Sequence, residues 1–408
     1  MRNKVLATIF IAFICITAVG QKSYLQFSDL VQTVITAQSE PFGAGALGNQ
    51  KKNDTVSEEL SIVEDNALGS LPYRTGMVRL NGAFLKAMGT RSYYDNQYGM
   101  SITRDGYIVG QYNRTTTDYE VAQMISFKEF LDEKGIRLLY VSESTKYIDD
   151  SFYSKEFGAE SYINRNADLF LERIGEAGID YLDLRDKIAE EGLDSQQMFY
   201  RTDHHWTVPA AFWAASKVAE KLNESGGYNI DTQIYNEDNY YCQFYENSWL
   251  GEQGWLVADT YVGLDDYTTV EPTFDTSFSV YSEDGVPVAD GSFDIFIDKS
   301  VYYSDLDYYD CPSWHYSYDA YNGHTVHNNY ADYGNVLILG DSYETPMAPF
   351  LALGIQDMKL IVMRNFWRSV REEVELGNYD TVIMAYAQFM IGAHDDESNA
   401  HYNMFNLE

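Results

Sequence analysis

Two hydrophobic patterns alternate along the chain, and their alternation predicts its central architecture. Apolar residues at helical spacing occupy residues 119–133 and 164–177, and a short, nearly continuous apolar run follows each of them at 136–141 and 179–184. The first pattern is typical of an amphipathic helix, and the second of a strand that is buried on both faces. Gly135 and Gly178 separate helix from strand in the two repeats.

The same alternation returns towards the C-terminus. Apolar strands are predicted at 336–339, 358–363 and 382–386, with a helix at about 366–376 between the last two. Short buried strands separated by amphipathic helices favour a parallel sheet that helices cover on both faces. We therefore predict a doubly wound α/β domain over residues 76–408.

Residues 228–333 interrupt this pattern. They are rich in Asp, Tyr, Ser, Thr and Gly and carry short alternating segments such as 276–281, which predicts a loop- and β-rich insertion. Its aromatic side chains either offer flat surfaces to sugar rings or pack against one another. The residues in question are Tyr302, Tyr303, Tyr308, Tyr309, Tyr316, Tyr318, Trp249, Trp255 and Trp314.

The N-terminal residues indicate export. Arg2 and Lys4 precede an apolar run over 5–19 and the small residues that end at Gly20. This order is that of a secretory signal, and the run serves equally as an uncleaved membrane anchor. We expect an extracytoplasmic protein, secreted or anchored by residues 1–20, with residues 21–75 as a polar linker or N-terminal extension.

The charge of the chain limits the kinds of molecule that it can bind. The formal charge is -34, from 28 basic and 62 acidic residues, so nucleic acid and anionic membrane surfaces are poor partners. A hydrophobic fraction of 45% is enough for a large core. Beyond Cys15 in the export segment, Cys242 and Cys311 either pair in an oxidising compartment or remain free thiols.

The first candidate for chemistry is Ser342, in the turn Gly340-Asp341-Ser342 that follows the predicted strand at 336–339. Open α/β sheets place their sites outside the carboxyl ends of the strands, which is where this turn falls. The backbone N–H of Ser342, with Gly340 nearby, is a candidate oxyanion donor. A serine hydroxyl is a poor nucleophile until a base removes its proton.

The candidate base lies much earlier, in Asp203-His204-His205-Trp206, just before a predicted helix. Residues two apart in an extended or turn segment project to the same side. Asp203 is therefore expected to hold one nitrogen of His205 while the other faces Ser342. His204 is expected to point elsewhere, as a supporting or substrate-contacting residue.

Two other interpretations of this cluster stay open. Asp203, His204 and His205 are metal-ligand types, and a zinc site would add His324 or His327. Against zinc, adjacent histidines diverge in direction and the helical His-x-x-x-His spacing is missing, so the prediction is a site without metal. The other interpretation is a structural polar cluster beside a buried indole.

These residues also carry a family resemblance. Residues 203–206, with Phe199-Tyr200-Arg201-Thr202 before them and Thr207 after, resemble the defining motif of the bacterial DHHW protein family. They resemble as well the Asp-x-His-Trp motif of the alginate O-acetylation proteins, which are SGNH-hydrolase-like, and residues 336–343 resemble the Gly-Asp-Ser turn of that group. The similarity covers most of residues 76–390. The serine follows the Asp and His, the reverse of ordinary SGNH hydrolases but the order of the alginate group.

The resemblance implies a serine nucleophile, a histidine base and an orienting aspartate, at Ser342, His205 and Asp203. Arg364 and Tyr386, which end the next two predicted strands, resemble an arginine and a tyrosine of the alginate group's site. With Gly340, His204 and Trp206 they are the candidate substrate and oxyanion residues. The asparagine that donates to the oxyanion in many SGNH enzymes has no counterpart that can be placed here.

The function so implied is that of an exported acyl-ester enzyme. We predict an O-acetyltransferase that uses an acyl-serine, no cofactor and no metal, and that acts on a cell-surface or secreted polysaccharide. Its partners would be the polysaccharide, an acetyl donor and a membrane acyl-transfer protein, with no nucleic acid. Water as the acceptor would make it a carbohydrate acetylesterase instead. The alternative from another class is a non-catalytic glycan-binding or scaffold protein of an exopolysaccharide system.

Overall fold

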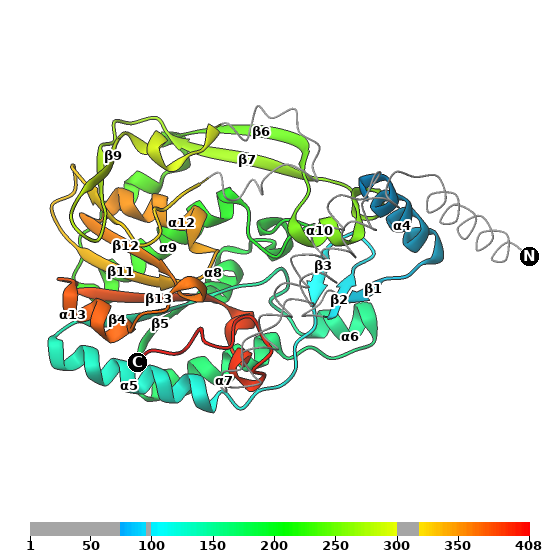
Figure 1. Cartoon of the computed structure of the whole chain (residues 1–408), viewed down its shortest axis with the longest axis horizontal. Coiled ribbons are helices and arrows are strands. Elements are labelled where there is room, and N and C mark those ends of the chain that lie inside the picture. Colours follow the sequence, from blue (N-terminus) through cyan, green and yellow to red (C-terminus); the bar gives the residue numbers. More distant parts are fainter. Residues whose placement is uncertain (1–73, 95–98, 300–317) are drawn as a thin grey trace, which may run out of the picture. The chain divides into compact units, whose positions relative to one another are not determined.

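A sheet of eight strands organises the protein in a computed structural model, which describes residues 74–94, 99–299 and 318–408 (Figure 1). The first five strands across the sheet pair in parallel, and the last three join antiparallel. In spatial order they are β5 (Asp180–Asp183), β4 (Arg137–Glu143), β13 (Thr381–Ala387), β11 (Asn335–Gly340), β12 (Asp357–Val362), β10 (Thr325–Asn328), β8 (Phe278–Tyr281) and β9 (Pro287–Gly291).

Helices cover both faces of the parallel strands, which confirms the predicted doubly wound α/β fold (Figure 1). Side chains alternate along each strand, so Val336 and Ile338 of β11 enter one core while Leu337 and Leu339 enter the other. The first core contains α9 (Val208–Gly226) and α12 (Glu344–Leu351), and the second contains α5 (Asp118–Lys134), α7 (Ile163–Glu176) and α13 (Val370–Leu376).

Local signals set the limits of these helices. Thr207 caps α9 by accepting a hydrogen bond from the backbone N–H of Ala210. Gly135 ends α5 in the left-handed conformation, with a φ of 71°. The helix predicted from residue 366 begins only at Val370, because the Ser369 side chain caps it there and a short 3-10 turn precedes it.

The predicted β-rich insertion divides between two sheets. Strands β6 (Tyr240–Trp249) and β7 (Asp265–Pro272) form a separate pair, whereas β8, β9 and β10 extend the central sheet. The sequence does not show this extension, because short alternating strands carry no signal for the sheet they join. Trp249 is buried against Tyr200 and Tyr267, so it packs in the core and offers no surface to a sugar.

The remaining elements lie around this framework. They are α4 (Arg74–Met88), the sheet of β1 (Ser92–Tyr94), β2 (Gly99–Ile102) and β3 (Ile108–Gly110), α6 (Ser151–Phe157), α8 (Leu184–Glu191), α10 (Glu252–Val257) and α11 (Asp259–Val262). Among the described residues, no helix is long and apolar enough to cross a membrane.

Several predictions fall outside the described residues. These are the export segment 1–20, the linker up to residue 73, and Tyr302 to Tyr316 with Trp314. Cys242 lies exposed on β6, while Cys311 is outside the described residues, so the pairing of the two thiols stays open. Tyr318 is described and is buried, with its hydroxyl hydrogen-bonded to the Val270 carbonyl at 2.8 Å.

Candidate active site

Ser342 lies in the turn between β11 and α12, at the carboxyl edge of the parallel strands. It is partly exposed, whereas Asp341 and Tyr343 on either side are buried. The Asp341 carboxylate fixes the turn, because it accepts from the backbone N–H of Tyr343 at 2.8 Å and of Ala387 at 2.9 Å. The hydroxyl of Ser342 is thus presented to solvent on a rigid support.

A chain of two short hydrogen bonds joins Ser342 to the Asp203 motif. The Nε2 atom of His205 lies 2.7 Å from Ser342 Oγ, and its Nδ1 atom lies 2.6 Å from Asp203 Oδ1. Asp203 and His205 are both buried. A base within hydrogen-bond distance of a hydroxyl, oriented by a carboxylate behind it, is the geometry that activates a serine nucleophile.

The backbone around Asp203 holds its carboxylate in place. Oδ1 also accepts from the His205 N–H at 3.0 Å, and Oδ2 accepts from the Glu252 N–H at 2.9 Å. Gly251 makes this approach possible, because a Cβ atom there would lie 2.4 Å from the Cβ of Asp203. Backbone N–H groups and His205 thus satisfy the Asp203 carboxylate as an acceptor.

Asp265, at the start of β7, supports the same turn from the insertion. Its carboxylate accepts from the backbone N–H groups of Arg201 and Thr202, both at 2.9 Å, and from the Thr202 hydroxyl at 2.5 Å. Thr202 Oγ in turn accepts from the Gly251 N–H at 2.7 Å. The insertion thus supports the segment that carries Asp203, a role that composition did not reveal.

Hydrogen bonds of Trp206 and Tyr343 connect the Asp203 segment with the turn that carries Ser342. The Trp206 indole N–H donates to the Tyr343 carbonyl at 3.0 Å, and the Tyr343 hydroxyl donates to the His204 carbonyl at 2.5 Å. Trp206 is buried, with 2% of its surface exposed. The prediction of Trp206 as a substrate contact is therefore wrong, because its polar atom and its ring are used to hold the serine turn.

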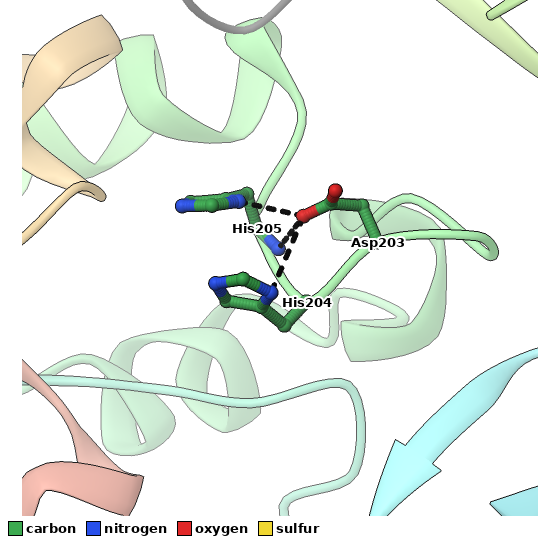
Figure 2. Close-up of side chains that lie close together, drawn as sticks. All are labelled: Asp203, His204 and His205. Carbon is green, nitrogen blue, oxygen red and sulfur yellow. Dashed lines mark hydrogen bonds and ion pairs between the residues drawn. The ribbon is translucent and has the colours of Figure 1, made fainter. Parts of the chain in front are cut away.

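His204 does not point away from His205 as predicted. Figure 2 shows both imidazoles on the same side of the Asp203 carboxylate, and their ring centroids are 3.9 Å apart. The chain bends through residues 201–205, so the alternation of an extended segment does not apply. The His204 side chain is 31% exposed. Its pKa is lowered, mainly because the ring is partly removed from water and secondly because His205 lies next to it. A neutral, partly exposed imidazole beside the base remains suited to contact a substrate.

The two histidines that would complete a zinc site, His324 and His327, have other partners. Ligand atoms of Asp203, His204 and His205 lie within 4.8 Å of one another, so their spacing alone would permit a metal. His327 is instead held by Asp357 at 2.8 Å, and His324 lies 3.1 Å from the Asn322 carbonyl. The Asp203 and His205 atoms that would bind a metal are hydrogen-bonded to each other and to Ser342.

Arg364 follows strand β12 at the same edge of the sheet at which Ser342 follows β11. Gly340 of β11 pairs with Val362 of β12, so Ser342 and Arg364 each lie two residues beyond a paired position on adjacent strands. Burial raises the pKa of Asp341, and the charge of Arg364 is among the groups that oppose this rise. Arg364 is exposed, which leaves its guanidinium available to a substrate.

Tyr386 and Gly340 have structural positions instead of contacts with substrate. Tyr386 is fully buried in the core on the α5 side of the sheet, and its hydroxyl donates to the Met404 carbonyl at 2.7 Å. The prediction of Tyr386 as a site residue is therefore wrong. Gly340 is required by packing, because a Cβ atom there would lie 2.5 Å from Glu344 Oε2.

Lys146 follows β4 and lies buried behind the motif. Its ammonium group donates to the carbonyl of Ile108 at 2.6 Å and of Arg201 at 3.3 Å. Burial lowers its pKa to about 7, although Asp203 and Asp265 act in the opposite direction. The lysine thus ties β3 to the segment that leads into Asp203. A large cavity of about 930 Å³ elsewhere, between α6, α7 and β5, includes none of the residues of the hydrogen-bonded relay.

Comparisons with known proteins agree with the fold. Residues 105–243 match the family model of the SGNH hydrolase-like domain, acetyltransferase AlgX, which confirms the resemblance predicted from the sequence. No match emerged from the comparison with curated proteins.

Two solved structures share the fold. PatB1 of Bacillus cereus, in a structure with a sulfonyl adduct, superposes with a TM-score of 0.59 at 15% identity, over 78% of this chain and 99% of its own. A DHHW family protein from Eubacterium siraeum gives a TM-score of 0.54 at 15% identity, over 77% of this chain and 96% of its own. At these identities the likeness establishes the architecture alone.

Proposed function

We propose that this protein is an SGNH-like serine acyl-ester enzyme that works as an O-acetyltransferase on a polysaccharide. The observation that carries the proposal is the relay from Asp203 through His205 to Ser342, with distances of 2.6 and 2.7 Å. The family model of an SGNH hydrolase-like acetyltransferase supports the same class. Neither the acceptor nor the donor follows from the fold, so both are part of the proposal.

The chemistry has two halves that use the same proton carrier. Ser342 Oγ attacks the carbonyl carbon of an acetyl ester while His205 Nε2 takes the hydroxyl proton, and collapse of the intermediate passes that proton to the leaving group. A sugar hydroxyl then attacks the acetyl-serine, gives its proton to His205, and becomes the new ester. The proton returns to Ser342 Oγ, so the enzyme is regenerated.

The negative charge on the intermediate needs donors at the serine turn. The backbone N–H of Ser342 has no hydrogen-bond partner in the described part of the chain and is the first candidate. Arg364, two residues beyond the adjacent strand β12 as Ser342 is two residues beyond β11, is the second. In this proposal the guanidinium takes the place of the missing asparagine donor.

A pocket of about 290 Å³ next to Arg364 suits the glycan. It is lined by residues of the 363–370 and 400–408 segments, including Trp367 and His401. Trp367 is 86% exposed, the largest exposed fraction among the described large hydrophobic side chains. An exposed indole offers an apolar face for a pyranose ring, so we propose that Trp367 contacts the sugar. The sequence had instead suggested aromatic residues of the insertion for this role.

Replacing Trp367 by alanine is expected to raise the KM for a glycan acceptor about fivefold, because an aromatic contact is worth about 1 kcal/mol. Hydrolysis of a small acetyl ester, which does not reach Trp367, should be unaffected. Tyr330→Ala removes another exposed aromatic ring, 68% exposed, and serves as the control. Equal KM values for Trp367→Ala and wild type would remove Trp367 from the proposed acceptor site.

Localisation belongs to the same proposal. Residues 1–20 would export the protein and either anchor it or be removed, which places Ser342 where surface or secreted polysaccharide is made. A membrane acyl-transfer protein would then supply the acetyl group. Fractionation of cells that produce the full chain tests this step, and recovery of the protein in the cytoplasmic fraction would contradict it.

An experiment in which a polysaccharide competes with water for the acetyl group distinguishes a transferase from an esterase. With a labelled acetyl donor and a deacetylated polysaccharide, a transferase should place label on the polysaccharide at the expense of free acetate. The esterase alternative predicts that acetate release does not change with polysaccharide concentration. A non-catalytic glycan-binding protein would yield neither product, and a serine-directed fluorophosphonate would not label Ser342.

A further inference from the structure

Three buried carboxyl groups lie directly behind the nucleophile turn. Glu143 ends β4, and Asp341 and Glu344 flank Ser342 at the end of β11 and the start of α12. Oxygen atoms of the three lie within 4.8 Å of one another, and at most 2% of any of the three residues is exposed. The relay between Asp203 and Ser342 makes no use of Glu143 or Glu344.

The hydrogen bonds of this cluster are unequally shared. Both oxygens of Asp341 accept backbone N–H groups, from Tyr343 and Ala387. Glu344 Oε2 accepts from the Asp341 N–H at 2.7 Å. Within the described residues, Glu344 Oε1 and both oxygens of Glu143 have no donor. Glu143 therefore faces two carboxyl groups from the turn between β11 and α12, and no hydrogen-bond donor in the described residues stabilises a charge of its own.

Three ionised carboxylates cannot share this space without a cation. Burial of an unpaired charge is strongly unfavourable, and a nearby charge of the same sign makes it worse. Neither lysine nor arginine hydrogen-bonds to the three carboxyl groups in the described part of the chain. A single proton reduces both problems, because a protonated carboxyl group donates to a carboxylate and carries no charge.

Glu143 is the member that keeps this proton. Asp341 and Glu344 accept N–H bonds that favour their ionised forms, whereas Glu143 accepts none. Burial raises the pKa of Glu143 well above its ordinary value, and Glu344 and Asp341 raise it further. The interaction between the two glutamate side chains raises the pKa of Glu143 and opposes the rise of the pKa of Glu344, which agrees with a proton on Glu143.

We propose that Glu143 is a positioning residue that stays protonated, donates its O–H to Glu344 Oε1, and so lets the Glu344 carboxylate hold the turn that carries Ser342. Glu344 reaches that turn through the Asp341 N–H and by packing on Gly340. The catalytic meaning of this role rests on the proposed acyl-transfer function, while the protonation itself does not.

Loss of the proton would add a third negative charge to the cluster behind the serine turn. His205 and Arg364 do not offset that charge, because they act on Asp341 and are not among the groups that act on Glu143 or Glu344. The titratable groups that act on the pair or feel its charge are Asp341, Tyr140, Tyr343 and Tyr386.

The sign of the pH dependence follows from the raised pKa. A carboxyl group whose pKa is higher in the folded protein contributes stability that is fully present below the unfolded value, near 4.5, and that is lost as pH rises through the folded value. Stability and activity of the wild type should both fall over that range. Glu143→Gln keeps a donor to Glu344 at every pH and should lack this component.

The test compares wild type, Glu143→Gln and Glu143→Leu. Difference infrared spectra should show the band of a buried, protonated carboxyl group in the wild type and not in Glu143→Gln. Between about pH 5 and about pH 9 the Tm of the wild type should fall at least about 3 °C more than that of Glu143→Gln. Turnover of an acetyl ester should survive in Glu143→Gln to higher pH than in wild type, and should be at least about tenfold lower in Glu143→Leu, which leaves Glu344 Oε1 without a donor.

Each result decides the proposal. An identical pH dependence of Tm in wild type and Glu143→Gln, or an unchanged infrared band, would overturn it, whether or not the protein is an acyltransferase. A rise in the Tm of the wild type with Ca²⁺ or Mg²⁺ that Glu143→Gln abolishes would show that a cation occupies the cluster, and would overturn it as well. If the infrared and Tm results are as expected but neither the wild type nor any variant turns over an ester, Glu143 is protonated as proposed and the proposed acyl-transfer function is wrong.

Discussion

Replacement of Ser342 by alanine is expected to lower acetyl transfer to a polysaccharide, and turnover of a small acetyl ester, by on the order of 10⁴-fold or more. The reason is that Ser342 Oγ is the atom 2.7 Å from His205 Nε2 that would become acetylated. Without it, His205 has no hydroxyl to deprotonate and no acyl-serine can form. Initial rates with a chromogenic acetyl ester measure the loss.

The substitution removes a single partly exposed oxygen, so the fold should survive it. Asp341 still fixes the turn through the Tyr343 and Ala387 N–H groups. Ser292→Ala removes an exposed hydroxyl that is bonded only to Asp294, and it should keep wild-type rates. Wild-type activity in Ser342→Ala, with an unchanged Tm, would show that another group is the nucleophile.

Replacement of Asp203 by asparagine is expected to cost a similar factor, on the order of 10⁴-fold in kcat. The carboxylate accepts from His205 Nδ1 at 2.6 Å and from two backbone N–H groups. An amide has one acceptor oxygen, so one of these donors would face an N–H group, and His205 would lose the partner that stabilises its protonated form. Steady-state kinetics with the same ester, alongside circular dichroism, measure the effect.

The chain offers a matched control for this substitution. Asp357 also accepts from a histidine, His327, at 2.8 Å, but the pair bridges β12 and β10 away from Ser342. Asp357→Asn should therefore leave kcat unchanged. If Asp203→Asn behaves like Asp357→Asn, then Asp203 does not orient the base, and the pair at residues 203 and 205 is structural.

The sequence predicted the parallel strands and the residues that lie at their carboxyl ends. Buried strands read as continuous apolar runs, so the stretch before Gly340 and the one that ends at Val141 were both identifiable. Once the strands are placed, the edge that carries Ser342 follows from the topology. Asp203 and His205 were identifiable from their residue types and their place before a predicted helix, although a bend in the chain and not strand alternation brings them together.

The contacts that hold the site were beyond the sequence. The hydrogen bond between Trp206 and Tyr343 joins residues 137 positions apart, and nothing local marks such a partner. Tyr386 shows the reverse error: a strand-end tyrosine resembles a site residue, but the pleat turns it into the α5 side of the core. The side of a sheet that a residue faces at its end depends on register, which only the assembled strands define.

Glu143 illustrates the same limit. A glutamate after an apolar strand reads as an exposed residue, yet it is fully buried because Glu344 and Asp341 close over it. Trp367 is the opposite case: it was predicted to lie in a helix, but it lies between the 3-10 turn that ends at Asn365 and the helix that begins at Val370, and it is exposed.

The intact mass of the protein after brief incubation with an acetyl donor tests the central claim most directly. Wild type should gain one acetyl group, mapped by peptide sequencing to Ser342, and should lose it when a deacetylated polysaccharide is added. Ser342→Ala should gain none. An acetyl group on a residue other than Ser342, or full turnover of donor with no dependence on Ser342, would contradict the account.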